Sequence, residues 1–201
     1  MSKVYTISGQ NKPYFITTTV VDWIDVFTRQ NYRDIIIDSL KYNIENKGLI
    51  VYAYVIMSNH LHIIIQAKNS NLSDILRDFK KHTAKAILNA IQQEPESRRE
   101  WMLERFRKAT ESHQRNTNFQ FWQYGNHTEE IYSQPFFWTK IDYIHFNPVR
   151  SGIVKRPQDY IYSSASNYIN QTGLINITLA DNPIINTLNL SNITKMISYD
   201  E

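Results

Sequence analysis

The stretch Leu49–Ala67, with the sequence LIVYAYVIMSNHLHIIIQA, decides the fold. Its first part, Leu49–Met57, is apolar and rich in β-branched and aromatic residues, which favours a buried strand. The pair Ser58-Asn59 is typical of a tight turn, and His60–Ala67 then reads as a second strand. The whole stretch therefore predicts an antiparallel β-hairpin.

Strands and helices are also predicted on both sides of this hairpin. Before it, Pro13–Val21 has strand composition, and Arg29–Lys47 has helical periodicity with Thr28 as N-cap and Gly48 as the stop. After it, we predict a long helix capped by Ser70 or Ser73 that ends near Gln93, a short helix over Ser97–Phe106, a strand over Phe119–Tyr124, and a helix that begins near Ser133 with Pro135 in its first turn and Pro148 closing it.

The order of these elements is strand, helix, strand, strand, helix, strand, helix. It predicts an α+β fold of the ferredoxin-like or RRM-like kind, an antiparallel sheet with helices packed on a face. We expect one domain over residues 1–170, followed by a loosely ordered C-terminal extension over residues 171–201.

Composition excludes several classes of protein. Of the 201 residues 42% are hydrophobic, which is enough for a packed core, and the absence of cysteine excludes disulfide frameworks and cysteine-based zinc sites. Met1–Gln10 does not have the pattern of a secretory leader, and apolar runs such as Ile63–Ile65 are too short to span a bilayer. We therefore expect a soluble, cytoplasmic protein without membrane contact.

The positive charge is concentrated in the middle of the chain. The formal net charge is +3, and between Lys68 and Arg115 there are 11 Lys or Arg against 7 Asp or Glu. Arg77, Lys81 and Lys85 repeat at helical spacing, so they form one line on the long helix. This line predicts either a solvated helix face or a surface for a polyanion such as a nucleic acid.

His60 and His62 are the first candidate for chemistry. Residues i and i+2 of a strand project from the same face, so both imidazoles point the same way. Two adjacent imidazoles form half of a metal site, although His-x-His also occurs by chance at strand ends.

The segment Asp142–Pro148 is the second candidate. On a helix Lys140, Tyr143 and Asn147 share one stripe, because residues four apart stack on the same face. Without further information Tyr143 could equally be an amphipathic border residue, and Asn147 a residue that ends the helix before Pro148.

Several ordered segments resemble one protein family. The sequence VYAYVIMSNHLHIII (Val51–Ile65) resembles the HUH strand of the single-tyrosine transposases of bacterial insertion sequences. YIHFNPVRSGIV (Tyr143–Val154) resembles the tyrosine helix of their REP-associated branch. RDFKKHTAKAI (Arg77–Ile87), FWQYGNHTEEIYS (Phe121–Ser133) and YIYSSASNY (Tyr160–Tyr168) resemble further segments in the same order. The resemblance runs from about Tyr14 to Tyr168, and Thr128 departs from it where the family has proline.

The resemblance implies the roles of individual residues. The metal ligands would be His60, His62 and Asn147, the nucleophile Tyr143, and the metal Mg²⁺ or Mn²⁺. Tyr124 and Tyr132 are alternative nucleophiles, and His127 and His145 are candidate auxiliary bases. DNA contacts are expected from Arg77, Lys80, Lys81, Lys85 and Arg150, and Lys140 could favour the phenolate of the tyrosine.

The implied function is DNA transposition. Such an enzyme would cleave and rejoin single-stranded, hairpin-forming DNA through a 5′-phosphotyrosine intermediate, as a monomer or a homodimer. The alternatives are a domesticated hairpin-binding protein without cleavage activity, an HUH replication-initiator-like nickase, and a metal-binding protein unrelated to nucleic acids. The chain has no phosphate-cradling Gly-rich loop, which disfavours the multidomain initiators.

Overall fold

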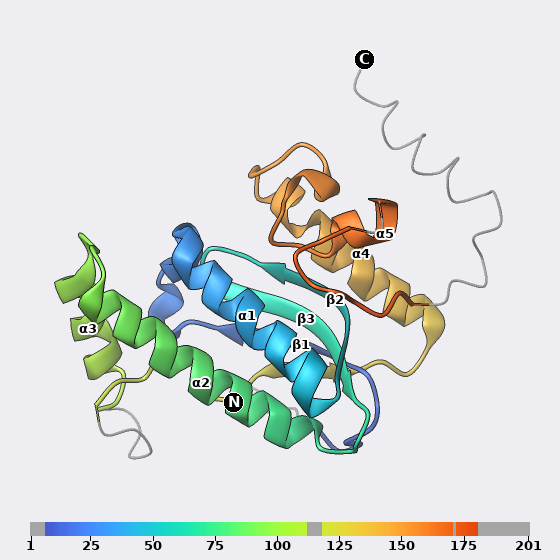
Figure 1. Ribbon diagram of the computed structural model, residues 1–201, viewed down its shortest axis with the longest axis horizontal. Coiled ribbons are helices and arrows are strands. Elements are labelled where there is room, and N and C mark those ends of the chain that lie inside the picture. Colours follow the sequence, from blue (N-terminus) through green and yellow to red (C-terminus); the bar gives the residue numbers. More distant parts are fainter. Residues whose placement is uncertain (1–6, 112–117, 171, 181–201) are drawn as a thin grey trace.

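A four-stranded antiparallel sheet forms the centre of the protein (Figure 1). The computed structural model describes residues 7–111, 118–170 and 172–180. The elements in chain order are β1 (Tyr14–Thr19), η1 (Val21–Trp23), η2 (Val26–Thr28), α1 (Gln30–Lys47), β2 (Leu49–Ile56), β3 (His60–Ala67), α2 (Leu72–Gln93), α3 (Arg99–Lys108), β4 (His127–Glu130), α4 (Gln134–Arg150), η3 (Pro157–Asp159) and α5 (Ala165–Asn170).

The strand order is β2-β3-β1-β4, and every neighbouring pair is antiparallel. The predicted hairpin is present as β2 and β3, and β1 inserts between β3 and β4. This arrangement confirms the predicted α+β fold with an antiparallel sheet.

Helices cover both faces of the sheet. Helices α1 and α2 pack against each other on one face, where Leu61 and Ile63 of β3 meet Leu40 of α1 and Phe79 of α2. Helix α4 packs on β2 and β3. It lies on the opposite face, because its Tyr143 meets the alternate residue His62 of β3.

The predicted strand over Phe119–Tyr124 is wrong. No element lies over these residues in the described structure, although Phe121 and Trp122 are both buried. The segment instead makes one isolated bridge, between Trp122 and Val20, and its backbone bonds to the ends of β1 and α3. The edge strand is the polar β4, which pairs with β1. Charged side chains are typical of sheet edges, and the composition of β4 does not signal a strand.

Two predicted helix caps are also wrong. The Thr28 hydroxyl donates to the Asp25 carbonyl, so it does not cap α1, whose N-cap residue is Arg29. Helix α2 follows Asn71, and its Ser73 N–H is bonded by Gln10 Oε1 at 2.8 Å. A side chain distant in the sequence therefore satisfies a helix terminus that we expected a serine to cap.

Two other predicted boundary residues, Gly48 and Ser133, are confirmed. Gly48 ends α1 in the left-handed conformation, with φ of 71°. Ser133 caps α4 by accepting a hydrogen bond from Phe136 N, as predicted, but Pro148 does not close this helix. Because Pro148 lies in the last turn, its missing N–H costs one hydrogen bond, and the helix continues to Arg150.

Part of the predicted C-terminal extension packs on the domain. Ile175 is buried, and Thr178 N donates to Val51 O of β2 at 2.9 Å. Residues 181–201 lie outside the described residues, so the boundary at residue 170 stays a prediction. None of the helices in the described part of the chain combines the length and hydrophobicity needed to cross a bilayer.

Candidate active site

His60 and His62 stand side by side at the start of β3. Their ring centroids are 4.6 Å apart, and His62 is 5% exposed. Phe15 of β1 stacks on the His62 ring at 5.6 Å, because the two residues lie on neighbouring strands and the same sheet face. The alternation predicted for β3 therefore directs both imidazoles toward α4.

Each histidine has its Nδ1 engaged by a neighbouring side chain. His60 Nδ1 lies 2.7 Å from Asn59 Oδ1, and His62 Nδ1 lies 2.7 Å from Thr17 Oγ1. An amide oxygen can only accept, so His60 carries its proton on Nδ1 when neutral, and the Thr17 hydroxyl can accept in the same way. In this tautomer the Nε2 lone pair of each ring is available as a ligand.

The surroundings keep both imidazoles neutral. Burial lowers the pKa of His60, against the opposing charge of Asp25. Burial, together with repulsion from Lys140 and from the protonated forms of His60 and His127, lowers the pKa of His62 to about 3. A neutral imidazole is the form that binds a metal ion.

Tyr143 approaches the histidines from α4. Its hydroxyl lies 3.5 Å from His62 Nε2, and the ring centroids are 5.1 Å apart. Phe15 meets the tyrosine ring edge-on at 5.9 Å, and 39% of Tyr143 is exposed. The phenol is thus held against the buried histidine while the site stays open to solvent.

Arg150 and Asn147 follow on the same helix. The Arg150 guanidinium lies 5.6 Å from the centroid of the Tyr143 ring, so a cation stands beside the predicted nucleophile. Asn147 is one helical turn beyond Tyr143 and is half-buried. In the described part of the chain its side-chain amide has no hydrogen-bond partner, so its oxygen is available to a ligand.

Lys140 is paired on the other side of the tyrosine. Its ammonium lies 2.6 Å from Glu129 Oε1, which also bonds His127 Nε2 at 2.8 Å. The same ammonium lies 4.5 Å from the centroid of Phe15. Glu129 therefore offsets the positive charge that was expected to favour the phenolate.

The other candidate residues lie in different surroundings. Tyr132 is 77% exposed and stacks on Phe136, and Tyr124 lines a groove beside α2. His145 is buried and bonds Ser164 Oγ at 2.9 Å, and burial lowers its pKa to about 4. His145 is therefore a structural residue that ties α4 to the segment after it.

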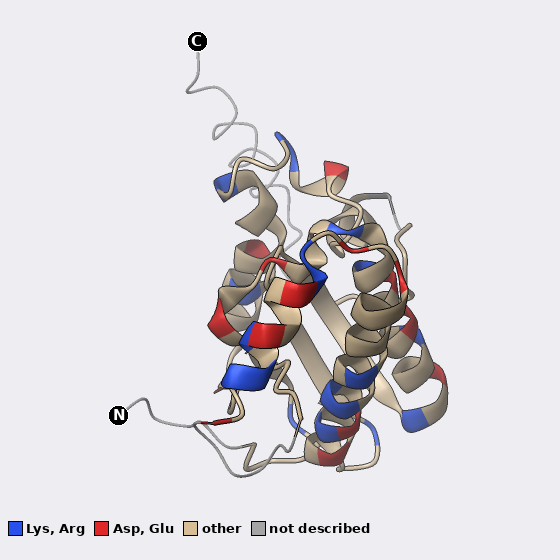
Figure 2. Cartoon of the chain, turned by 90° about the vertical axis from the view of Figure 1, so that its left-hand side faces the viewer, with Lys and Arg blue, Asp and Glu red and all other residues tan. Residues whose placement is uncertain are grey.

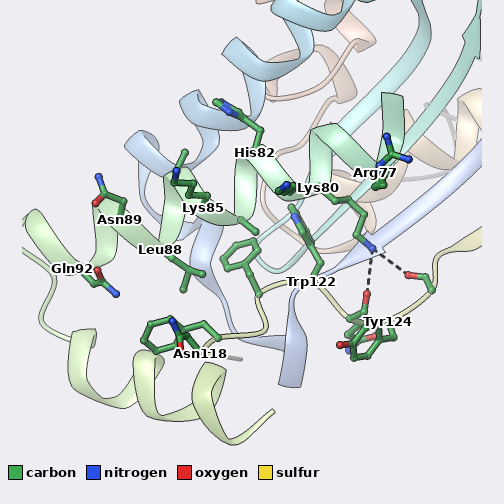
Figure 3. Close-up of a pocket in the computed structure, with 17 residues that line it drawn as sticks. Arg77, Lys80, His82, Lys85, Leu88, Asn89, Gln92, Asn118, Trp122 and Tyr124 are labelled. Atoms are coloured by element: carbon green, nitrogen blue, oxygen red, sulfur yellow. Dashed lines mark hydrogen bonds between the residues drawn. The ribbon is translucent and has the colours of Figure 1, made fainter. Parts of the chain in front are cut away.

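The predicted cations of α2 differ in what they contact. Arg77 pairs with Asp74 at 2.6 Å and with Asp78 at 3.2 Å. Lys80 donates to Gln123 O at 3.2 Å and to Gly125 O at 3.3 Å (Figure 3). It also donates to Asn126 Oδ1 at 2.9 Å, and burial lowers its pKa to about 8. Lys80 is therefore half-buried and anchors the 123–126 segment.

Lys81 and Lys85 are exposed, as is Arg77, whose guanidinium is already paired with Asp74 and Asp78. Figure 2 shows blue segments along α2, with acidic residues at its first turns. Between α2 and residues 118–125 is a groove of about 1110 Å³, and Lys81, Lys85 and Tyr124 are among the residues that line it (Figure 3). The groove joins positive charge to an exposed aromatic ring, a combination that suits a nucleic acid.

Sequence reasoning missed Thr17, Asn59 and Trp23. Thr17 alternates with Phe15 on β1, a pattern that could have placed it on the histidine face. Asn59 precedes His60 directly, but nothing in the sequence shows that its oxygen bonds this histidine. Trp23, which lies 6.0 Å from His60 between ring centroids, has no sequence signal linking it to the histidines.

The donor set fits a divalent metal ion. Two neutral imidazoles and the amide oxygen of Asn147 are donor types that Mn²⁺ accepts, while Mg²⁺ prefers the oxygen. In the described residues there is no cluster of three or more His, Cys, Asp or Glu side chains suited to a metal. The predicted ligand set is not a cluster of this kind, because it combines two histidines with the side-chain amide of Asn147.

Comparisons with known proteins agree with this fold. A family model described as "Transposase IS200 like" matches residues 14–125, which include both histidines and more than half of the chain. Comparison with curated proteins gives no significant match.

A solved structure of a REP-associated tyrosine transposase bound to a REP hairpin has a TM-score of 0.57 and 18% sequence identity. The alignment covers 91% of this chain and 96% of that one, so the two share a fold over nearly their whole lengths. Together with the family match across β1, the histidine strand and α2, these findings show that the chain belongs to the IS200-like transposase family.

Proposed function

We propose that this protein cleaves and rejoins single-stranded, hairpin-forming DNA, with Tyr143 as the nucleophile. The observation that carries the proposal is the approach of the Tyr143 hydroxyl to within 3.5 Å of His62 Nε2. Two histidines held in one tautomer and a tyrosine directed at them have no evident purpose in a protein that only binds DNA.

The reaction is a transesterification at phosphorus. The Tyr143 oxygen attacks a backbone phosphate, a bond forms from this oxygen to phosphorus, and the bond from phosphorus to the 3′ oxygen breaks. The 3′ oxygen leaves as a hydroxyl group, and the phenolic proton passes to solvent or a nearby base. Attack of a second 3′ hydroxyl on the phosphotyrosine reverses these bond changes and joins two strands without ATP.

His60, His62 and Asn147 would hold the divalent metal. Mg²⁺ or Mn²⁺ at this position would supply Lewis-acid stabilisation of the charge that develops on the phosphate oxygens. Arg150, whose guanidinium lies beside the tyrosine ring, would bind a phosphate oxygen directly.

The groove beside α2 is the proposed grip on the hairpin stem. The solved relative of the same fold was captured with a REP hairpin. In this chain Lys81 and Lys85 are exposed along the groove, and phosphates prefer such a line of cations.

A covalent adduct is the direct test. Wild-type protein is incubated with labelled hairpin oligonucleotides from the flanks of its own gene and with Mn²⁺ or Mg²⁺, then run on a denaturing gel. We expect an adduct with wild type and with Tyr132→Phe, and none with Tyr143→Phe or after chelation. An adduct that survives Tyr143→Phe would move the nucleophile to another tyrosine, and tight binding without an adduct would favour the hairpin-binding alternative.

Tyr143 meets His62 of the same molecule, so one chain supplies both the proposed nucleophile and a proposed metal ligand. We therefore propose that a monomer suffices. Mixing Tyr143→Phe with His60→Ala protein tests this, because exchange of helices between subunits would restore one intact site. We expect the mixture to stay inactive. Recovery of adduct in the mixture would show a dimer that shares its active sites.

A further inference from the structure

Trp23 is an exposed aromatic residue beside the histidines. Its side chain is 58% exposed, and its ring meets His60 edge-on at 6.0 Å between centroids. A large indole gains little stability from such a position, because most of its apolar surface stays in water. Burial therefore does not explain why a tryptophan occupies this position, and contact with a ligand explains it better.

The backbone presents this indole at a cost. Asp22 and Trp23 both have positive φ, of 53° and 55°, which is an uncommon conformation for residues other than glycine. Strained residues of this kind persist where the surroundings hold them, and they concentrate at functional sites. Here Trp23 N donates to Val20 O at 3.1 Å, at the end of β1.

Asn59 links the indole to the histidine. Its Nδ2 donates to Trp23 O at 3.1 Å and to Asp25 Oδ1 at 3.0 Å, while its Oδ1 accepts from His60 Nδ1 at 2.7 Å. One amide therefore fixes both the tautomer of His60 and the position of the Trp23 backbone. The indole and the imidazole are positioned as a unit.

We propose that Trp23 is a stacking platform for the nucleobase next to the scissile phosphate of single-stranded DNA. This inference rests on the proposed function, in which the phosphate sits between Tyr143 and the histidines. A base joined to the sugar on the His60 side of that phosphate comes within reach of the indole. Stacking on an indole needs an unpaired base with a free face, so the platform favours single-stranded over duplex DNA at the point of cleavage.

Affinity measurements test the platform without requiring cleavage. Trp23→Gly is the main variant, because glycine suits the left-handed backbone and the variant should fold at least as stably as wild type. In the Tyr143→Phe background and with chelator, we expect Trp23→Gly to bind hairpin oligonucleotides about 5- to 100-fold more weakly. Tyr42→Ala removes an aromatic ring that is 55% exposed on α1, on the opposite face, and should leave the affinity unchanged.

Abasic substitutions locate the stacked base. In protein that has Trp23, removing the base at one position next to the cleaved phosphodiester should weaken binding about as much as Trp23→Gly does. In Trp23→Gly the same abasic oligonucleotide should bind as tightly as the unmodified one. Tryptophan fluorescence gives an independent signal: quenching by the oligonucleotide should be weaker in Trp23→Phe than in wild type and unchanged in Trp101→Phe, which removes another exposed tryptophan.

Equal penalties for the abasic site with and without Trp23 would overturn the platform, as would unchanged affinity in Trp23→Gly. The adduct assay with unmodified DNA reports the proposed function separately. Wild type that forms adduct while Trp23→Gly binds normally leaves the proposed function standing and removes only this inference. If these affinity differences are found but wild type forms no adduct, the stacking platform stands and the proposed cleavage activity is refuted.

Discussion

The hydrogen bond from His62 to Thr17 offers a sharp test of the proposed metal site. Thr17→Val keeps the shape of the side chain and removes the hydroxyl that lies 2.7 Å from His62 Nδ1. The adjacent Thr18 provides a matched control on the same strand, because its side chain points to the opposite face. Its buried Oγ1 has no hydrogen-bond partner within the described structure.

The magnitude follows from what each hydroxyl contacts. His62 is 5% exposed, so water cannot readily replace the lost hydroxyl as the hydrogen-bond partner of its Nδ1–H. Leaving such a donor unsatisfied costs about 1–3 kcal/mol. Loss of the partner that orients a ligating histidine weakens metal binding by about 10- to 100-fold, or about 1.4–2.8 kcal/mol. Thr18→Val removes a buried hydroxyl without a partner and should be neutral or stabilising by about 1 kcal/mol.

Two measurements decide the matter. Titration calorimetry with Mn²⁺ gives the metal affinity, and urea denaturation of the metal-free protein gives the free energy of unfolding. We expect Thr17→Val to lose affinity and stability, and Thr18→Val to lose neither. Metal affinity of Thr17→Val within about twofold of wild type would refute the reasoning that this bond prepares His62 as a ligand. Equal losses in both variants would show a general effect of changing β1.

Three further predictions concern DNA binding and stability. Lys81→Ala and Lys85→Ala should each weaken hairpin binding and reduce the slope of log affinity against log salt by about one. Lys80→Met should instead lower the free energy of unfolding and leave this slope unchanged. An equal loss of slope in Lys80→Met would contradict the anchoring role of Lys80. Burial alone would raise the pKa of the Glu96 carboxyl, but Arg98 and Arg29 outweigh it and hold the pKa below 4.5. Denaturation at a series of pH values gives the difference in unfolding free energy between wild type and Glu96→Gln. This difference should be largest at neutral pH and shrink as the pH falls below 4.5. A difference that grows on acidification would argue against the ion pairs. Ser133→Ala should cost about 1 kcal/mol of unfolding free energy through loss of the α4 cap, and no measurable cost would mean that the cap is not formed in solution.

Much of the fold was predictable because its signals are local. The alternation in His60–Ala67 and the apolar run before it required a hairpin, and Gly48 and Ser133 mark helix boundaries through backbone and side-chain preferences of single residues. The errors arose where distant residues compete with local preference. Gln10 takes the capping role at α2, and the polar β4 forms a strand because β1 has an open edge to pair with.

The sequence by itself determined that His60 and His62 share a strand face and that Tyr143 and Asn147 share a helix face, because both follow from the repeat of a single element. Only the tertiary structure decided that these two faces meet, with Tyr143 and His62 in contact across 81 positions of the chain. It also decided that Thr17 and Asn59 orient the imidazoles, that Lys80 serves the protein interior, and that Trp23 stands beside His60. These relations depend on how β1, β3 and α4 pack, and packing between separate elements leaves no periodic trace in the sequence.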